Sequence, residues 1–320
     1  MNEINIKAKL INAINQAVPE EENAASLIAK LLGIGKESAY RRLRGNVNFS
    51  FTEVAIIANR LGISLDDLFG LVQQEDALFK LRLLNEEHSI DVYMNKLAEY
   101  TKVLQQMNSN SHNVVLRLAQ NSLSLYNILR HYNLSKFYMY NWLRYTQAEY
   151  TNLKFSEFEL PEKFTIIQNK YVAEIQKISH FILILDPNVY ASSVKDIDYF
   201  HHINLLTLED EKLIKQDLLS SINNLEEMAT TGHTKRGAKV DMYVSSINIE
   251  TSYIHIESEN QNYSEFLVYA LFSLDTQNTS LNQTQKDWID SLKKYCTSIS
   301  QCGEIERYNF FNKQRELIRG

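Results

Sequence analysis

A short segment near the start of the chain carries side chains suited to hydrogen bonding and charge pairing with a polyanion. Between residues 36 and 44, four cationic side chains stand against one carboxylate, together with a hydroxyl group and a phenol. Lysine and arginine can donate to guanine or to phosphate, a carboxylate can accept from the amino group of cytosine, and serine can do either. The residues concerned are Lys36, Glu37, Ser38, Tyr40, Arg41, Arg42 and Arg44. This set suits contacts with duplex DNA if one helix presents it outward.

Glycines and capping residues divide the surrounding sequence into short helices. Apolar residues at helical spacing predict a first helix over residues 4–18. A second helix begins after Asn23, a good N-cap. It ends at Gly33, because a helix C-terminus favours a left-handed residue without a β-carbon. Residues 36–43 then form a third helix, which Gly45 ends in the same way. The charged side of this third helix is expected to face outward.

Two further helices complete this region. Ser50 and Glu53, three residues apart, form the capping-box pattern at the start of a fourth helix. Ser64, with Asp67 three residues later, caps a short fifth helix. The sequence therefore predicts a compact five-helix domain over residues 1–72.

This arrangement resembles the lambda-repressor/Cro family of helix-turn-helix domains, the xenobiotic-response-element class. The stretches LLGIGKESAYRRLRG (31–45) and FTEVAIIANRLGISLDDLF (51–69) carry the resemblance, which covers about residues 5–70. It implies a recognition helix that enters the major groove of double-stranded DNA. The residues that it places among the base-reading positions are Lys36, Glu37, Ser38, Tyr40 and Arg41. The residues assigned to phosphate are Arg42 and Arg44.

The composition fits a soluble globular protein of about two domains. The chain has 320 residues, 44% of them hydrophobic, and a net charge of −6. Residues 1–72 hold eight Lys or Arg and eight Asp or Glu, so the acidic total does not argue against a DNA partner. With neither a secretory leader nor an apolar run long enough to cross a bilayer, a cytoplasmic location without membrane association is expected.

Catalytic residues, metal ligands and cofactors are not expected. The histidines lack the HExxH spacing, the serines lack a GxSxG frame, and no glycine-rich phosphate loop is present. Cys296 and Cys302 are expected to be reduced structural cysteines. Lys235 and Arg236, within the loop 230–239, could bind an anion, although a solvated loop is the simpler interpretation.

The rest of the chain is predicted to contain a helical linker or dimerisation region over 73–160 and an α+β regulatory domain over 161–320. Within 71–107, apolar residues repeat at alternating spacings of three and four. This seam could form a short coiled coil between two protomers, or the apolar face of a helix that packs on its own domain. Its members are Ile90, Tyr93, Leu97, Tyr100, Leu104 and Met107.

Less distinct signals follow along the chain. Apolar spacing predicts a helix over about 114–132, and the aromatic block 136–150 could line a ligand pocket, although plain core is favoured. HFILIL (180–185) could be a buried helix end or a strand, whereas 240–257 and 265–274 have the residue types of strands. The fold is therefore expected to be mainly α: a five-helix N-terminal domain, a large helical region and a C-terminal α+β unit.

The leading hypothesis is a sequence-specific transcriptional regulator. One recognition helix reads few base pairs, so such domains usually act as two-fold dimers on half-sites about 34 Å apart. The C-terminal region would supply dimerisation and sense a small-molecule or protein effector. Two alternatives are a signalling or scaffold protein that uses the helix-turn-helix for protein contacts, and an enzyme with an attached DNA-binding domain.

Overall fold

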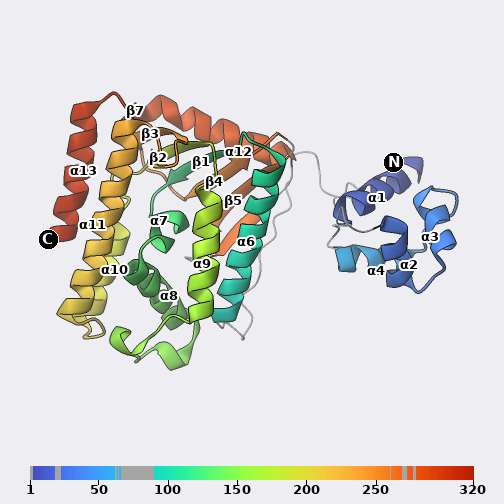
Figure 1. The fold of residues 1–320 in the computed structure, drawn as a ribbon, viewed down its shortest axis with the longest axis horizontal. Helices are drawn as coiled ribbons and strands as arrows, with labels where there is room; N and C mark the ends of the chain where they lie inside the picture. The colour runs from blue at the N-terminus through green and yellow to red at the C-terminus, as the bar shows by residue number, and fades with distance from the viewer. Residues whose placement is uncertain are drawn as a thin grey trace. The chain divides into compact units, whose positions relative to one another are not determined.

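The computed structural model describes residues 3–18, 23–61, 63, 65, 90–259, 261–268, 272–276 and 279–320. The chain divides into two compact units, Met1–Leu78 and Phe79–Gly320, each described here by itself (Figure 1). The fifth helix expected near Ser64 lies outside the described residues. In the described part of the chain, no helix is long and apolar enough to cross a membrane.

The first unit contains four described helices around a small apolar core. They are α1 (Glu3–Ala17), α2 (Ala24–Leu32), α3 (Lys36–Leu43) and α4 (Phe51–Leu61) (Figure 1). Every one of them contributes to the centre of the unit, where the buried side chains are Leu10, Ile14, Ala25, Ile28, Ala39 and Ile57. Because each helix buries only one stripe of residues, its opposite side is left for solvent or for a partner.

The helix boundaries follow the local signals in the sequence. The Asn23 side chain accepts a hydrogen bond from the Ser26 amide at 3.1 Å, and Gly33 ends α2 in the left-handed conformation with φ of 66°. Gly45 also has a positive φ, 77°. At the start of α4 the predicted capping box is present. The Ser50 amide donates to Glu53 at 2.8 Å, and the Glu53 amide donates to the Ser50 hydroxyl at 3.2 Å.

The second unit is built on a mixed sheet with the strand order β6-β5-β4-β1-β2-β3-β7. The three strands β1, β2 and β3 run parallel, and the other neighbours are antiparallel. The strands are β1 (Val115–Gln120), β2 (His180–Leu185), β3 (Lys239–Ser245), β4 (Tyr253–Glu257), β5 (Asn262–Val268), β6 (Phe272–Thr276) and β7 (Cys296–Ser298).

Helices cover both faces of this sheet, unequally. Leu116 and Leu118 of β1 face the main core, to which most helices contribute, whereas Ala119 packs with Ile289 and Leu292 of α12 on the other face. This alternation is the ordinary period of a strand. The helices are α6 (Ile90–Asn110), α7 (Leu125–Leu129), α8 (Tyr132–Thr146), α9 (Glu162–Ile175), α10 (Ala191–His202), α11 (Leu208–Thr231), α12 (Thr279–Leu292) and α13 (Glu304–Arg319) (Figure 1). Short 3-10 turns occupy 148–150, 155–157 and 293–295.

The expectation of a mainly α fold with a separate C-terminal α+β unit is wrong. The helix predicted over 114–132 is instead the central strand β1 followed by the five-residue helix α7. Val115 and Leu118 had helical spacing by coincidence, because a strand buried on both faces shows no alternation of polar and apolar residues. Since β1 pairs with β2 and β4, the sheet joins sequence from both sides of residue 160.

Burial and strand pairing bear on three alternatives that the sequence left open. The seam of α6 packs within its own unit, because Tyr93, Leu97, Leu104 and Met107 are all at most 4% exposed and α6 lies against α9 (Figure 1). These side chains are therefore not available for a coiled coil between protomers. Several residues of the aromatic block are buried in the same core, while Tyr138 of the block also lines a cavity of about 300 Å³. HFILIL forms strand β2.

Candidate nucleic-acid interface

Helix α3 is fixed by one side and exposed on the other. Ala39 is fully buried against the core of the first unit, and Leu43, one turn further on, is partly buried. Gly35 precedes the helix in an extended conformation and supplies no side-chain cap. No capping side chain therefore covers the first backbone N–H groups of α3, which lie next to Lys36 and Glu37.

The sequence-predicted site residues divide into two groups by exposure. Ser38 and Arg42 are partly buried, whereas five side chains are exposed on α3 and the residue after it. The exposed side chains are Lys36, Glu37, Tyr40, Arg41 and Arg44. The structure thus brings together three exposed cations, one carboxylate and one phenol over nine residues.

Arg42 is held inside the first unit rather than presented to solvent. Its guanidinium lies 2.9 Å from Glu53 Oε1, and its Nε donates to Glu53 Oε2 at 3.3 Å. A further guanidinium nitrogen donates to the Ser38 hydroxyl at 2.6 Å. The side chains of Arg42 and Glu53 are 17% and 18% exposed. The amide of Ser50 and then this arginine lower the pKa of Glu53, although desolvation opposes them. The pair ties α3 to the start of α4.

Tyr40 is positioned by a residue that the sequence identified only as a helix cap. The Asn23 side-chain oxygen accepts a hydrogen bond from the Ser26 amide. The Asn23 side-chain nitrogen donates a hydrogen bond to the Tyr40 hydroxyl at 3.2 Å. The Arg44 guanidinium lies 6.0 Å from the centre of the Tyr40 ring, at the limit of a cation–π contact. Asn23 therefore couples the start of α2 to the exposed face of α3.

A second contact that sequence reasoning missed fixes the segment after α3. The Lys7 ammonium of α1 donates to the Gly45 carbonyl. A β-carbon at Gly45 would lie 3.2 Å from Lys7 Cε, so this position combines a positive φ with close approach of a side chain. No pattern in the sequence pairs two residues this far apart.

The arrangement can donate hydrogen bonds and positive charge to an anionic partner along one helix of eight residues. Because Glu53 neutralises Arg42, the outward field comes from Lys36, Arg41 and Arg44, with Glu37 as the acceptor. In the described residues, no three His, Cys, Asp or Glu side chains are grouped so as to hold a metal ion. The exposed side chains of this face can form hydrogen bonds and ion pairs with a partner.

Comparison with known proteins agrees with this class of site. Residues 4–112, about a third of the chain, match the family model described as a BetR domain, a DNA-binding type of transcriptional-regulator domain. The matched range contains α1 to α4 and continues through α6, which belongs to the second unit. No curated protein and no solved structure matched the chain. The match supports a DNA-binding regulatory role for the N-terminal third.

Proposed function

We propose that this protein is a sequence-specific transcriptional regulator whose helix α3 enters the major groove in the manner of the lambda-repressor/Cro class. The observation that carries the proposal is the exposure of Lys36, Glu37, Tyr40, Arg41 and Arg44 on a helix that is anchored from behind. Exposed cationic side chains can donate hydrogen bonds to phosphates and to guanine, and the one exposed carboxylate can accept a hydrogen bond from cytosine. The family match to residues 4–112 supports the same role.

Within this proposal the site residues have different tasks. Lys36, Glu37, Tyr40 and Arg41 read base edges, and Arg44 contacts phosphate. Arg42, which the sequence assigned to phosphate, instead positions α3, because Glu53 and Ser38 already hold its guanidinium. Ser38 shares this positioning task through the hydrogen bond that it accepts from Arg42, while its own hydroxyl hydrogen can still reach a base.

The proposal includes a two-fold dimer and a sensing role for residues 79–320. A single helix contacts too few base pairs to find one genomic site, and a dimer doubles the sequence read. The seam of α6 is buried within its own unit, so another surface must join the two copies. The second unit senses an effector and has no catalytic role, and the protein acts in the cytoplasm on double-stranded DNA.

Selection of duplexes from a random library by the full-length protein tests this function. We expect enrichment of a two-fold symmetric site and an affinity that falls steeply with salt. The variant Arg41→Ala should lose the selected site. The matched control Arg60→Ala, which removes an exposed cation of α4, should keep it. Failure to enrich any sequence, or equal losses in the two variants, would contradict the proposal.

A further inference from the structure

Two cavities of the second unit lie on either side of helix α7. The larger, of about 300 Å³, is walled mainly by apolar side chains and tyrosine rings from α6, α7, α9, β1, β4 and β5. The smaller, of about 230 Å³, lies between α7, α11 and the loop that precedes β3. The larger cavity has the size and the mainly apolar walls that are typical of small-molecule sites, whereas the smaller cavity is lined mostly by polar and charged side chains.

A third, small space of about 10 Å³ is lined by residues of both cavities and by residues of α7. It shares Tyr126, Phe181 and Met228 with the smaller cavity. It shares Leu116 and Leu118, among others, with the larger one. This third space has room for about one water molecule, but Met228 is an unbranched side chain that can change rotamer and widen it. A rotamer change of Met228 would therefore connect the three spaces into one elongated site with a constriction beneath α7.

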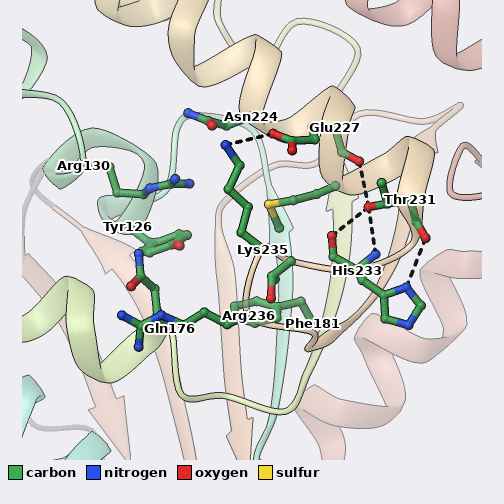
Figure 2. Close-up of a pocket in the computed structure, with 12 residues that line it drawn as sticks. Tyr126, Arg130, Gln176, Phe181, Asn224, Glu227, Thr231, His233, Lys235 and Arg236 are labelled. Atoms are coloured by element: carbon green, nitrogen blue, oxygen red, sulfur yellow. Dashed lines mark hydrogen bonds and ion pairs between the residues drawn. The ribbon is translucent and has the colours of Figure 1, made fainter.

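Cationic side chains surround the smaller cavity. Figure 2 shows Arg130, Lys235 and Arg236 around the smaller cavity, with the ring of Tyr126 between the two arginines. Lys235 pairs with Glu227 at 3.1 Å. Among the described residues, neither arginine is paired with a carboxylate, and the Arg130 guanidinium lies 5.1 Å from the centre of the Tyr126 ring. This end of the site has an excess of positive charge.

The tight turn that carries two of these cations is built into the sequence. The Gly237 amide donates to the Thr234 carbonyl at 2.8 Å, and Gly237 has a φ of 85°, which favours glycine. Lys235 and Arg236 occupy the two central positions of this turn. The sequence TKRG thus holds both cations at the mouth of the cavity.

A buried polar atom in the third space also lacks a partner. Gln120, at the end of β1, is 3% exposed and lines this space beneath α7. Its side-chain oxygen accepts no hydrogen bond from any described residue. Since buried acceptors are nearly always satisfied, this oxygen indicates a water or ligand atom in the third space.

The larger cavity carries carboxyl groups and lacks cationic side chains among its described lining residues. Asp196 and Glu265 line the larger cavity, and Glu265 is 7% exposed. Burial raises the pKa of Asp196, so this cavity is a poor place for a second negative charge. Whatever occupies the site is therefore oriented, with its anionic group at the end that Arg130 and Arg236 line.

We infer that the second unit binds an amphiphile that has one anionic headgroup and an unbranched apolar chain. The headgroup, a carboxylate or a phosphate monoester, is held by Arg130 and Arg236, and the chain runs beneath α7 into the larger cavity. Binding stands independently of DNA recognition; that this ligand is the effector rests on the proposed function. Tyr100 and Leu104 of α6 line the larger cavity, so the chain would contact a helix within the matched regulator range.

Titration calorimetry of the full-length protein with n-alkanoates of increasing length tests the site. We expect the affinity to rise about fourfold per methylene until the larger cavity is filled. The variants Arg130→Gln and Arg236→Gln should each weaken binding about tenfold or more, whereas Arg319→Gln, an exposed arginine on α13, should leave it unchanged. Met228→Trp should abolish the dependence on chain length.

Three further probes separate the possible ligands. Alkyl phosphates and alkanoates of equal chain length distinguish the two headgroups, because the tighter binder carries the headgroup that the site prefers. Alkylammonium ions and α,ω-dicarboxylates should bind at least tenfold more weakly than the matched monocarboxylate. The inference is overturned if affinity is independent of chain length, if inorganic phosphate alone binds as well as alkyl phosphate, or if the arginine variants bind like the native chain. Ligand binding that leaves DNA affinity unchanged supports the site and refutes only its role as the effector site.

Discussion

Replacing Arg42 and replacing Arg44 should produce opposite patterns of defect. The sequence assigns both arginines to phosphate, but the structure holds Arg42 with Glu53 and leaves Arg44 exposed. We expect Arg42→Ala to loosen the attachment of α3 to α4 without changing the number of phosphate contacts. We expect Arg44→Ala to remove a phosphate contact without loosening the helix.

The size of each effect follows from these contacts. Hydrogen bonds to charged groups contribute roughly 1.5–3 kcal/mol when buried, and exposed ion pairs contribute about 0–1 kcal/mol. The Arg42 and Glu53 side chains, 17% and 18% exposed, fall between these cases, so a loss of about 1.5 kcal/mol is reasonable. That corresponds to a roughly tenfold larger population of the open segment, and so to about tenfold faster amide exchange. Losing one phosphate contact should lower the slope of log K against log salt by about 0.9 per protomer.

Hydrogen exchange of the α3 and α4 amides and salt-dependent fluorescence anisotropy measure the two effects in the full chain. Arg42→Ala should accelerate exchange and keep the salt slope, and Glu53→Ala should reproduce the faster exchange. Arg44→Ala should show native exchange and a shallower slope. A shallower slope in Arg42→Ala, with exchange unchanged, would refute the positioning role and return this arginine to phosphate binding.

Three other predictions concern base preference, folding and pH. Glu37→Ala should relax selectivity at one base position by roughly 1–3 kcal/mol if Glu37 accepts from cytosine, and an unchanged preference in site selection would exclude it from readout. Gly33→Ala should destabilise the first unit by about 1 kcal/mol in denaturant titrations because φ is 66°, whereas Gly35→Ala, at φ of −65°, should change stability by less than about 0.5 kcal/mol; equal effects would contradict the left-handed cap. Burial, and then the charge of Arg117, lower the pKa of His255 from 6.5 to about 4. Between these values the unfolded chain binds more protons, so stability should fall by up to about 3 kcal/mol as the pH drops from 6.5 towards 4. The variant His255→Gln should flatten that part of the pH–stability curve, and an unaltered curve would show that other groups cause it.

The sequence predicted the four described helices of the first unit well because their signals are local. Caps, left-handed glycines and helical periodicity each act within a few residues, and Asn23, Gly33 and the Ser50–Glu53 capping box lie where the pattern placed them. The pairing of Arg42 with Glu53, eleven residues apart, needs the angle between two helices, which no local pattern supplies. The sequence alone therefore could not show that Arg42 is paired with Glu53 and not free to contact phosphate.

The second unit was poorly predicted because its order is set by distant pairings. Strand β1 hydrogen-bonds to β2 and β4, more than 55 residues away in each case, and both of its faces are buried. Its residues therefore show neither clear alternation nor a true helical repeat. The elongated site could not be foreseen either, since Arg130 and Arg236 come from segments about a hundred residues apart. Two features of the site were visible beforehand: Lys235 and Arg236 in a glycine-containing loop, and the aromatic block 136–150, whose Tyr138 lines the larger cavity.

Photocrosslinking from within α3 tests most directly whether this helix enters DNA. Tyr40 is 39% exposed on the proposed reading face, and Tyr308, 61% exposed on α13, is the matched control. With p-benzoylphenylalanine at each position in turn, irradiation of the full-length protein on its selected duplex should attach DNA to position 40 and not to position 308. Crosslinking at position 308 with none at position 40 would contradict the account.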